Sequence, residues 1–316
     1  MTKHLADRPG ARAARSRRRP RGGPAPRVAL ASLPHAHERA DAENVARVRA
    51  NTRRVKLLTA GAAAVPAVVL GVVVGIVVGT VAGAGAAVAA CVVAVLFVHV
   101  RALPIALRLV GAVPVADGAL PALANQVEGL CATIGVSPPE LWLVDDPVAN
   151  SCALAGPGPR EVLVVTSGLL ERMGLIEMEG VVAHELVHLK RRDAAVSSVA
   201  LASVGLVSWL TGRDALVHRA VGRGREYGAD QAAALAVRYP PGLHAALASM
   251  GGPAGEPAGE PAGGQRGQRG RASAFAGRRW AATRWIWIDP MVGDREAAPD
   301  GELDATRARM DALAQW

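Results

Sequence analysis

The sequence predicts an α+β domain that follows an N-terminal two-helix transmembrane hairpin. Three observations lead to this prediction. Residues 57–100 contain no Asp, Glu, Lys or Arg. Short β-type runs follow at 141–144 and 161–166, with a loop rich in Gly and Pro between them. A helical pattern then covers 175–192. A membrane-spanning pair and a domain of mixed strands and helices account for all three.

The basic charge of the chain is confined to its N-terminus. The net charge is +9, with 36 basic and 27 acidic residues. Residues 1–56 hold 15 of the basic and 4 of the acidic residues, so the remainder is close to neutral. This excludes a uniformly basic nucleic-acid-binding body. We expect 1–56 to be a basic, mostly disordered cytosolic tail that fixes membrane orientation, with a short polar helix near 38–54. Contact with anionic lipid or RNA is the alternative role for the tail.

The uncharged segment 57–100 is long enough for two membrane spans. As one helix it would measure about 66 Å, roughly twice the hydrocarbon thickness of a bilayer. A glycine-rich turn predicts helices near 57–78 and 84–100 instead. The first predicted helix carries small residues at intervals of four, which are Gly71, Gly75 and Gly79. Such a spacing allows close helix packing in membranes.

Basic residues flank both outer ends of the predicted hairpin. Arg53 and Lys56 precede it, and Arg101 and Arg108 follow it. By the positive-inside rule both ends lie in the cytoplasm, so the sequence predicts a multi-pass plasma-membrane protein whose following domain is cytoplasmic. Three scattered cysteines supply neither a disulfide framework nor a cysteine zinc site.

Composition divides the rest of the chain into three parts. We expect a soluble domain at 101–250, a disordered Pro/Ala/Gly linker at 251–272, and a C-terminal helical segment at 273–316. Tryptophans alternate with arginines over 278–287, which fits packing on the domain, a lipid headgroup boundary, or stacking on single-stranded nucleic acid. The 161–166 strand is either a platform for an extended peptide or an ordinary interior strand.

The 175–192 helix contains the pattern His-x-x-x-His with a glutamate after the first histidine. His184 and His188 are four residues apart, so both imidazoles project from one helical face and can reach one zinc ion. Glu185 is offset around the helix, where a carboxylate can approach a water next to the metal. Two surface histidines are the alternative explanation.

A tetrahedral catalytic zinc site needs a third protein ligand. Glu226 and Asp230 lie one turn apart on a second predicted helix. Glu226 can complete the ligand set, and Asp230 can accept a hydrogen bond from a ligand histidine and fix its tautomer. A solvated helix face is the alternative for this pair.

These motifs resemble the membrane-bound zinc metallopeptidases of the HtpX and CAAX-prenyl-protease type. The resemblance runs from about residue 140 to 230 and rests on four stretches. They are Asn150-Ser151-Cys152-Ala153, residues 164–170, Ala183 to His188 with Asp193, and residues 225–230. It implies a zincin-like (gluzincin) α+β catalytic domain with one zinc ion per chain on His184, His188 and Glu226, and with Glu185 as general base.

Two features depart from the family pattern. Family members carry a His-Pro pair near the C-terminus, whereas this chain has Asp289-Pro290, followed at 306–313 by a stretch that resembles the family's closing helix. The role of that histidine is therefore open here, and the sequence offers other residues that can help to stabilise the oxyanion. The candidates are Tyr227, His218 and His244.

The second departure is an uncharged segment at 194–212. A single span there would place Glu226 across the bilayer from the histidines, so we expect a buried, re-entrant or membrane-surface helix. The resulting prediction is a membrane-anchored zinc endopeptidase that acts on peptide or membrane-associated protein substrates. The resemblance adds a role in membrane protein quality control. A catalytically silent zinc-binding sensor or scaffold is the alternative, and nucleic acid is not an expected partner.

Overall fold

The computed structural model describes residues 33–205, 221, 225–250, 283–289 and 300–315. The chain divides into two compact units, Met1–Arg39 and Ala40–Trp316. Of the first unit only the helical residues 33–39 are described, and the second unit contains the sheet and the site. The predicted linker 251–272 and the first 32 residues of the predicted tail lie outside the described residues.

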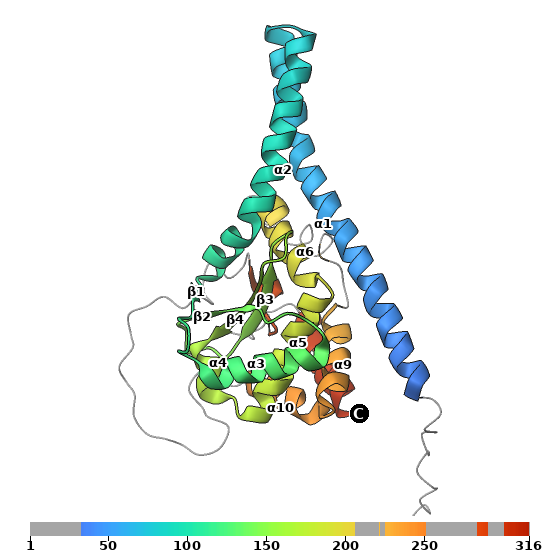
Figure 1. The fold of residues 1–316 in the computed structure, drawn as a ribbon, viewed down its shortest axis with the longest axis vertical. Helices are drawn as coiled ribbons and strands as arrows, with labels where there is room; N and C mark the ends of the chain where they lie inside the picture. The colour runs from blue at the N-terminus through green and yellow to red at the C-terminus, as the bar shows by residue number, and fades with distance from the viewer. Residues whose placement is uncertain (1–32, 206–220, 222–224, 251–282, 290–299, 316) are drawn as a thin grey trace, which may run out of the picture. The chain divides into compact units, whose positions relative to one another are not determined.

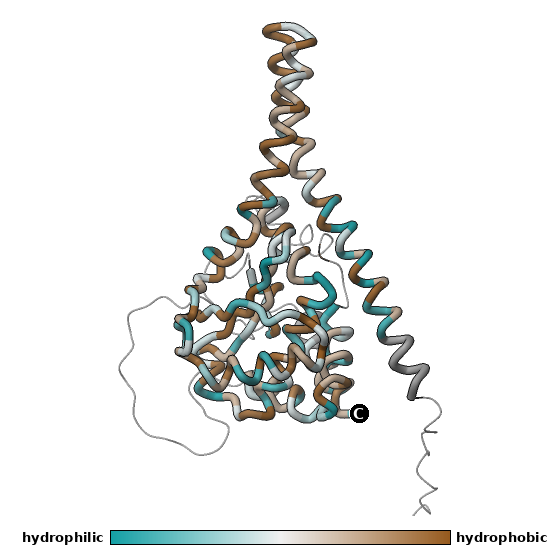
Figure 2. Tube along the Cα trace, in the orientation of Figure 1, coloured by the Kyte–Doolittle hydropathy of each residue, from teal (hydrophilic) through white to brown (hydrophobic). Residues whose placement is uncertain are grey.

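Two long helices form the predicted N-terminal hairpin (Figure 1). Helix α1 spans Leu33–Val77 and α2 spans Thr80–Val110, and both are long and apolar enough to cross a membrane. The chain turns at Gly79, whose φ of 124° is unfavourable for other residues. Helix α1 is continuous from Leu33 to Val77, so residues 33–56 are helical, and Figure 2 shows the change from polar to apolar residues along its coloured part. Helix α2 extends past the predicted end at 100 and stops at the left-handed Gly111.

Glycines bring α1 and α2 into close contact. Gly71 and Gly75 of α1 face Gly83 of α2, where an added Cβ would lie 2.6 Å from the Gly71 carbonyl oxygen and 2.6 Å from the Gly75 Cα. Gly79, which we expected on the same face, lies in the turn with open space around it. The small-residue contact is therefore made by Gly71 and Gly75 with Gly83 of the second helix, and Gly79 takes no part in it.

The described strands form one four-stranded sheet in the order β1-β2-β4-β3. Strand β4 pairs in parallel with β2 and antiparallel with β3, while the short β1 pairs antiparallel with β2. Because β4 has neighbours on both sides, the predicted strand at 161–166 is an interior strand and not an edge open to a peptide. The bounds are Val113–Pro114 for β1, Glu140–Val144 for β2, Ser151–Ala155 for β3 and Glu161–Thr166 for β4.

Helix α5 (Leu175–Lys190) is the central helix of the domain. It contacts β3 and β4 and packs most extensively against three of its neighbouring helices (Figure 1). Its buried face carries eleven residues from Met178 to Leu189, far more than an amphipathic surface helix would bury. The neighbours are α3 (Pro121–Ile134), α9 (Arg225–Val237) and α10 (Pro240–Met250), with the short α4 (Ser167–Arg172) following β4.

The described part of the uncharged segment is buried inside the domain. Helix α6 (Asp193–Ala200) continues into a π-helical turn at Leu201–Gly205, and residues 194–201 are all buried. This favours the buried alternative for these residues, and 206–212 lie outside the described residues. Helix α6 contacts β3 and α2, so the segment fills the space between sheet and hairpin.

The C-terminal residues pack on the same domain. Trp287 is buried, and the Arg225 guanidinium lies 5.8 Å from the ring centroid of Trp285. Packing thus accounts for the described tryptophans of this stretch, while residues 278–282 lie outside the described part. A short 3-10 turn (Arg284–Ile286) precedes the last helix, α12 (Asp300–Ala314), which contacts α9 and α10.

Substituting Gly83 by Ala should destabilise the hairpin. The new Cβ meets backbone atoms at 2.6 Å, so the two helices must separate. Overpacking of this kind costs about 1–3 kcal/mol. Far-UV circular dichroism during titration of the detergent-solubilised protein with SDS measures the loss.

Gly85→Ala is the matched control, because nothing lies within 4 Å of a Cβ added at Gly85. If both variants unfold at the same SDS fraction as the unmodified protein, the described glycine contact does not hold the hairpin together.

Candidate metal centre

Helix α5 places three polar side chains in the interior of the domain. Its N-terminus is fixed by the Glu177 carboxylate, which accepts a hydrogen bond from the Gly174 amide at 2.8 Å. His184, Glu185 and His188 then lie in the buried second half of the helix. Buried polar groups need partners, so this triplet marks a built site within an otherwise apolar core.

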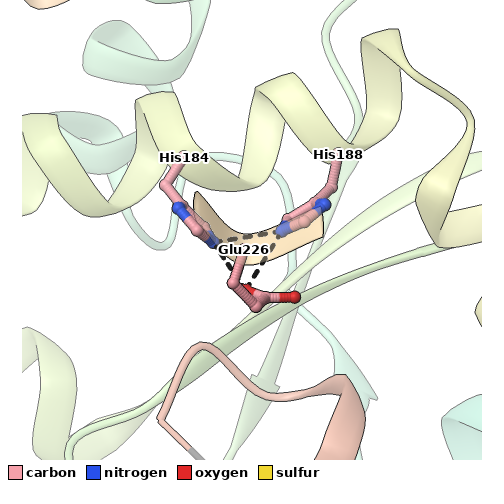
Figure 3. A group of neighbouring side chains, drawn as sticks. All are labelled: His184, His188 and Glu226. Carbon is pink, nitrogen blue, oxygen red and sulfur yellow. Dashed lines mark hydrogen bonds and ion pairs between the residues drawn. The ribbon is translucent and has the colours of Figure 1, made fainter. Parts of the chain in front are cut away.

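Helix α9 supplies the third candidate metal ligand, after His184 and His188. Glu226, in its first turn, points its Oε2 atom at both imidazoles (Figure 3). The distances are 3.2 Å from Oε2 to His184 Nε2, 3.4 Å to His188 Nε2, and 3.1 Å between the two Nε2 atoms. The structure thus brings the three predicted ligands together, with their donor atoms within 4.8 Å of one another.

The spacing of these donor atoms fits one metal ion. Tetrahedral zinc with bonds of about 2.0–2.1 Å sets its ligand atoms about 3.3 Å apart. The three donor–donor distances above lie within about 0.2 Å of that spacing. Two neutral imidazoles and a carboxylate leave the fourth position for water or substrate, which is the arrangement of catalytic rather than structural sites.

Each imidazole is oriented by a carboxylate on its outer nitrogen. His184 Nδ1 lies 2.8 Å from Asp230 Oδ1, and His188 Nδ1 lies 3.2 Å from Asp193 Oδ2. A carboxylate beside Nδ1 favours the proton on that nitrogen and leaves the Nε2 lone pair directed at the metal position. Asp230 therefore lies where the sequence predicted it. Asp193 has the same role for the second histidine, a role that the sequence analysis did not assign.

Arg309 of α12 holds Asp230 in place. Its buried guanidinium donates to both Asp230 oxygens, at 2.6 and 2.8 Å, and to the Ile288 carbonyl oxygen at 2.9 Å. Such a bidentate pair fixes the orientation of the carboxylate as well as its position. Sequence reasoning missed this residue, although the stretch 306–313 had been singled out by its resemblance to a closing helix.

Arg225 orients the carboxylate of Glu226. Its Nε lies 2.9 Å from Glu226 Oε1, which leaves Oε2 for the imidazoles. The remaining guanidinium nitrogens donate to the Ser197 hydroxyl at 2.7 Å and to the Trp285 carbonyl at 2.8 Å. Arg225 thereby connects the site to helix α6 and to the C-terminal segment.

The opposite charges of the site shift the pKa values of His188, Asp230 and Glu226 toward the ionised forms. Burial disfavours protonation of His188, but the carboxylates of Glu226 and Asp193 outweigh it and raise the pKa to about 10. Burial likewise opposes ionisation of Asp230, yet the adjacent Arg309 lowers its pKa to about 2. The pKa of Glu226 is held well below its usual value, against burial, by the charge of His188 and the hydrogen bond of His184. In the metal-free site the raised pKa of His188 favours its protonated form.

Glu185 differs from the other carboxylates of the site. Burial raises its pKa above the usual value, because desolvation outweighs the nearby imidazole charges. The Ser151 hydroxyl donates to its Oε1 at 2.7 Å, and Ser151 begins the edge strand β3. A carboxylate with a raised pKa, one residue after His184 on the same helix, is suited to accept and return a proton.

The three oxyanion candidates fall in different places. Tyr227 follows Glu226 on α9 and is 42% exposed. His244 is half-buried on α10, directly after Leu243, which contacts Gly180 of α5. His218 lies outside the described residues.

Asp289, which the sequence offers as the nearest counterpart of the His-Pro pair, is buried beside strand β3. Its backbone NH donates to Asn150 Oδ1 at 3.2 Å, and its carbonyl accepts from Asn150 Nδ2 at 2.8 Å. The Ile288 NH also donates to the Ser151 carbonyl at 3.0 Å. The Asn150-Ser151 motif thus connects the C-terminal segment to the strand that carries the Glu185 hydrogen bond.

Comparison with known proteins finds similarity over the region that contains the site. A model described as Peptidase family M48 matches residues 120–250. A protein named Protease HtpX homolog from Dictyoglomus turgidum is 34% identical over 160 residues, which cover 40% of this chain and 53% of that protein. The protein of the same name from Tropheryma whipplei (strain Twist) is 36% identical over 167 residues, 42% of this chain and 57% of the relative.

A third relative with this name, from Salinibacter ruber, is 31% identical over 170 residues, 46% of this chain and 62% of its own length. The chain thus spans between 53% and 62% of these relatives. No solved structure matches it significantly.

The metal-free protein should lose stability as the pH rises. A histidine whose pKa is higher in the folded than in the unfolded chain stabilises the fold fully below the unfolded value. That contribution disappears as the pH passes from 6.5 toward about 10, the two values for His188. The melting temperature of the chelator-treated protein should therefore fall across this range.

The zinc-loaded protein is the control, because the ion replaces the protons on the imidazoles. The stabilisation that zinc adds should grow with pH. A zinc-dependent increase in melting temperature that shrinks as the pH rises would contradict the charge arrangement described here.

Proposed function

We propose that the chain is a membrane-anchored zinc endopeptidase, because residues 120–250 match the model described as Peptidase family M48. The observation that carries the proposal is the convergence of His184, His188 and Glu226 beside a buried general-base candidate, Glu185. The curated relatives are named proteases, which supports the same activity.

Zinc is the metal that suits this site best. Two imidazoles and a carboxylate form the donor set of several catalytic zinc sites, while magnesium and calcium prefer oxygen ligands alone. One ion per chain is expected, held by His184, His188 and Glu226. When bound, it supplies Lewis-acid chemistry that polarises the peptide carbonyl and makes a water acidic enough to react near neutral pH.

The residues of the chain perform the proton transfers. The Glu185 carboxylate accepts the proton of the attacking water and returns it to the amine that leaves. Ser151 holds Glu185 through the hydrogen bond at 2.7 Å. Asp193 and Asp230 keep the imidazoles in the tautomer that directs Nε2 inward, and Arg309 fixes Asp230. Tyr227, His218 and His244 remain the candidates for stabilising the oxyanion.

The substrates that we propose are membrane-associated proteins or peptides. Helices α1 and α2 would keep the site close to the bilayer, and the basic residues at both outer ends of the hairpin favour a cytoplasmic catalytic domain in the plasma membrane. A role in membrane protein quality control would follow from the resemblance to HtpX-type proteases.

A silent zinc-binding sensor or scaffold is the second candidate. Asp289 in place of the family histidine favours it, because a histidine at that position is lost. The buried and hydrogen-bonded Glu185 argues against it, since a purely structural site has no need for a buried proton acceptor.

Glu185→Gln should keep zinc and lose hydrolysis. The amide preserves the size of the side chain but cannot accept the proton, and loss of a general base typically costs about 10²–10⁴-fold in rate. Metal analysis of the detergent-purified protein and a casein cleavage assay measure the two properties. Glu179→Gln, on the same helix but only partly buried, is the control and should behave as the unmodified protein. Equal cleavage by both variants would rule out the mechanism.

Reporter fusions should place the domain in the cytoplasm. Alkaline phosphatase, which is active only outside the cytoplasm, should be active when fused after residue 82 in the hairpin and inactive when fused after residue 120. Green fluorescent protein should give the reverse pattern. Phosphatase activity at residue 120 would overturn the orientation.

A further inference from the structure

The polar part of α1 contacts the metal-site helices before the apolar part begins. Asn51 is completely buried, although charged residues surround it in the sequence. Its Nδ2 donates to the Arg191 carbonyl at 2.8 Å and to Asp193 Oδ1 at 2.7 Å. Its Oδ1 accepts from Arg54 at 3.3 Å. Every polar atom of this side chain therefore has a partner, and the amide has one defined orientation.

These two donated bonds act on the corner that follows the ligand helix. Arg191 is the C-cap of α5, and its carbonyl is one of the groups that helix ends leave without an intrahelical partner. Arg192 then adopts a positive φ of 60°, and Asp193 begins α6. Asn51 thus closes the end of the helix that carries His184 and His188 and holds the first residue of the next helix.

Asp193 divides its two oxygens between the anchor helix and a ligand. Oδ1 accepts from Asn51, and Oδ2 lies 3.2 Å from His188 Nδ1. A carboxylate is planar, so fixing one oxygen limits where the other can lie. A continuous path of 2.7 and 3.2 Å contacts therefore runs from α1 to the imidazole. Carboxylates in this position are known to tune metal affinity about 10–100-fold.

The contact belongs to a stripe along one face of α1. Asn44, two turns before Asn51, accepts from Arg191 Nε at 2.8 Å. Val55, Leu58 and Ala62 continue the face and pack with the main core. The stripe repeats at intervals of three, four and seven residues, which is the spacing of one helical face. The helix that leads into the membrane is thus part of the packed domain.

We propose that Asn51 is a positioning residue of the metal centre, which it orients through Asp193 and His188. The proposal rests on the zinc site of the proposed function. It makes residues 44–56, which composition assigns to a basic tail, a structural part of the catalytic unit. The anchor helix then sets the geometry of the site as well as its distance from the membrane.

The test compares the zinc affinity of full-length variants in detergent, measured by competition with a chromophoric chelator. Asn51→Ala should weaken zinc binding about 10–100-fold, because Asp193 loses its fixed orientation. With saturating zinc, kcat should fall while KM stays unchanged. Asn44→Ala is the matched control: it removes a hydrogen bond of the same helix face without touching Asp193, and zinc affinity should stay within about twofold.

A double-mutant cycle separates positioning from general packing. If Asn51 acts through Asp193, the Asn51→Ala/Asp193→Ala variant should bind zinc no more weakly than Asp193→Ala alone. Additive losses, or equal losses in Asn51→Ala and Asn44→Ala, would overturn the proposal. Asn51→Ser, whose hydroxyl is shorter, is measured alongside and should weaken binding in the same direction if the alanine variant does not fold.

Failure of this proposal and failure of the proposed function give different results. An unmodified protein that binds no zinc refutes the proposed function. Normal zinc binding by the unmodified protein and by Asn51→Ala refutes the positioning role alone.

Discussion

The structure depends on one electrostatic constraint, the burial of two imidazoles against a carboxylate. His184 and His188 lose their contact with water, and Glu226 Oε2 lies within 3.4 Å of both. Groups of this kind are stable inside a protein only when each polar atom has a partner. The surrounding side chains supply these partners: Asp193 and Asp230 at the outer nitrogens, and Arg225 and Arg309 behind the carboxylates. The site is therefore a small network of alternating charges within an apolar core.

Those partners come from distant parts of the chain, and this explains the arrangement of the elements. Arg309 is in the last helix, Arg225 in α9, Asp193 in α6 and Ser151 in β3. Helix α12 and the segment before it must pack on the domain for Arg309 to reach Asp230. Helix α1 must contact the α5–α6 corner for Asn51 to reach Asp193. The fold and the site are thus stabilised by the same contacts.

Patterns that depend on local spacing were predictable from the sequence. The four-residue separation of the histidines, the ExxxD spacing of Glu226 and Asp230, and the absence of charge over 57–100 each predict a feature that the structure contains. Partners that depend on tertiary packing were not. Asn51 is a polar residue among charged ones, and its position on a helix face does not by itself predict burial or a contact with Asp193. Gly79 was placed in the helix contact because spacing alone does not show where a turn begins.

X-ray absorption at the zinc edge tests the central claim most directly, because it reads the ligands themselves. Zinc on His184, His188 and Glu226 predicts a first shell of nitrogen and oxygen only, at about 2.0–2.2 Å, with the outer-shell scattering of two imidazoles. His188→Ala should remove one imidazole from that signal. The alternative is a sulfur ligand, for which we consider Cys152, a fully buried residue of β3. A sulfur shell at about 2.3 Å, or an unchanged spectrum in His188→Ala, would contradict the account.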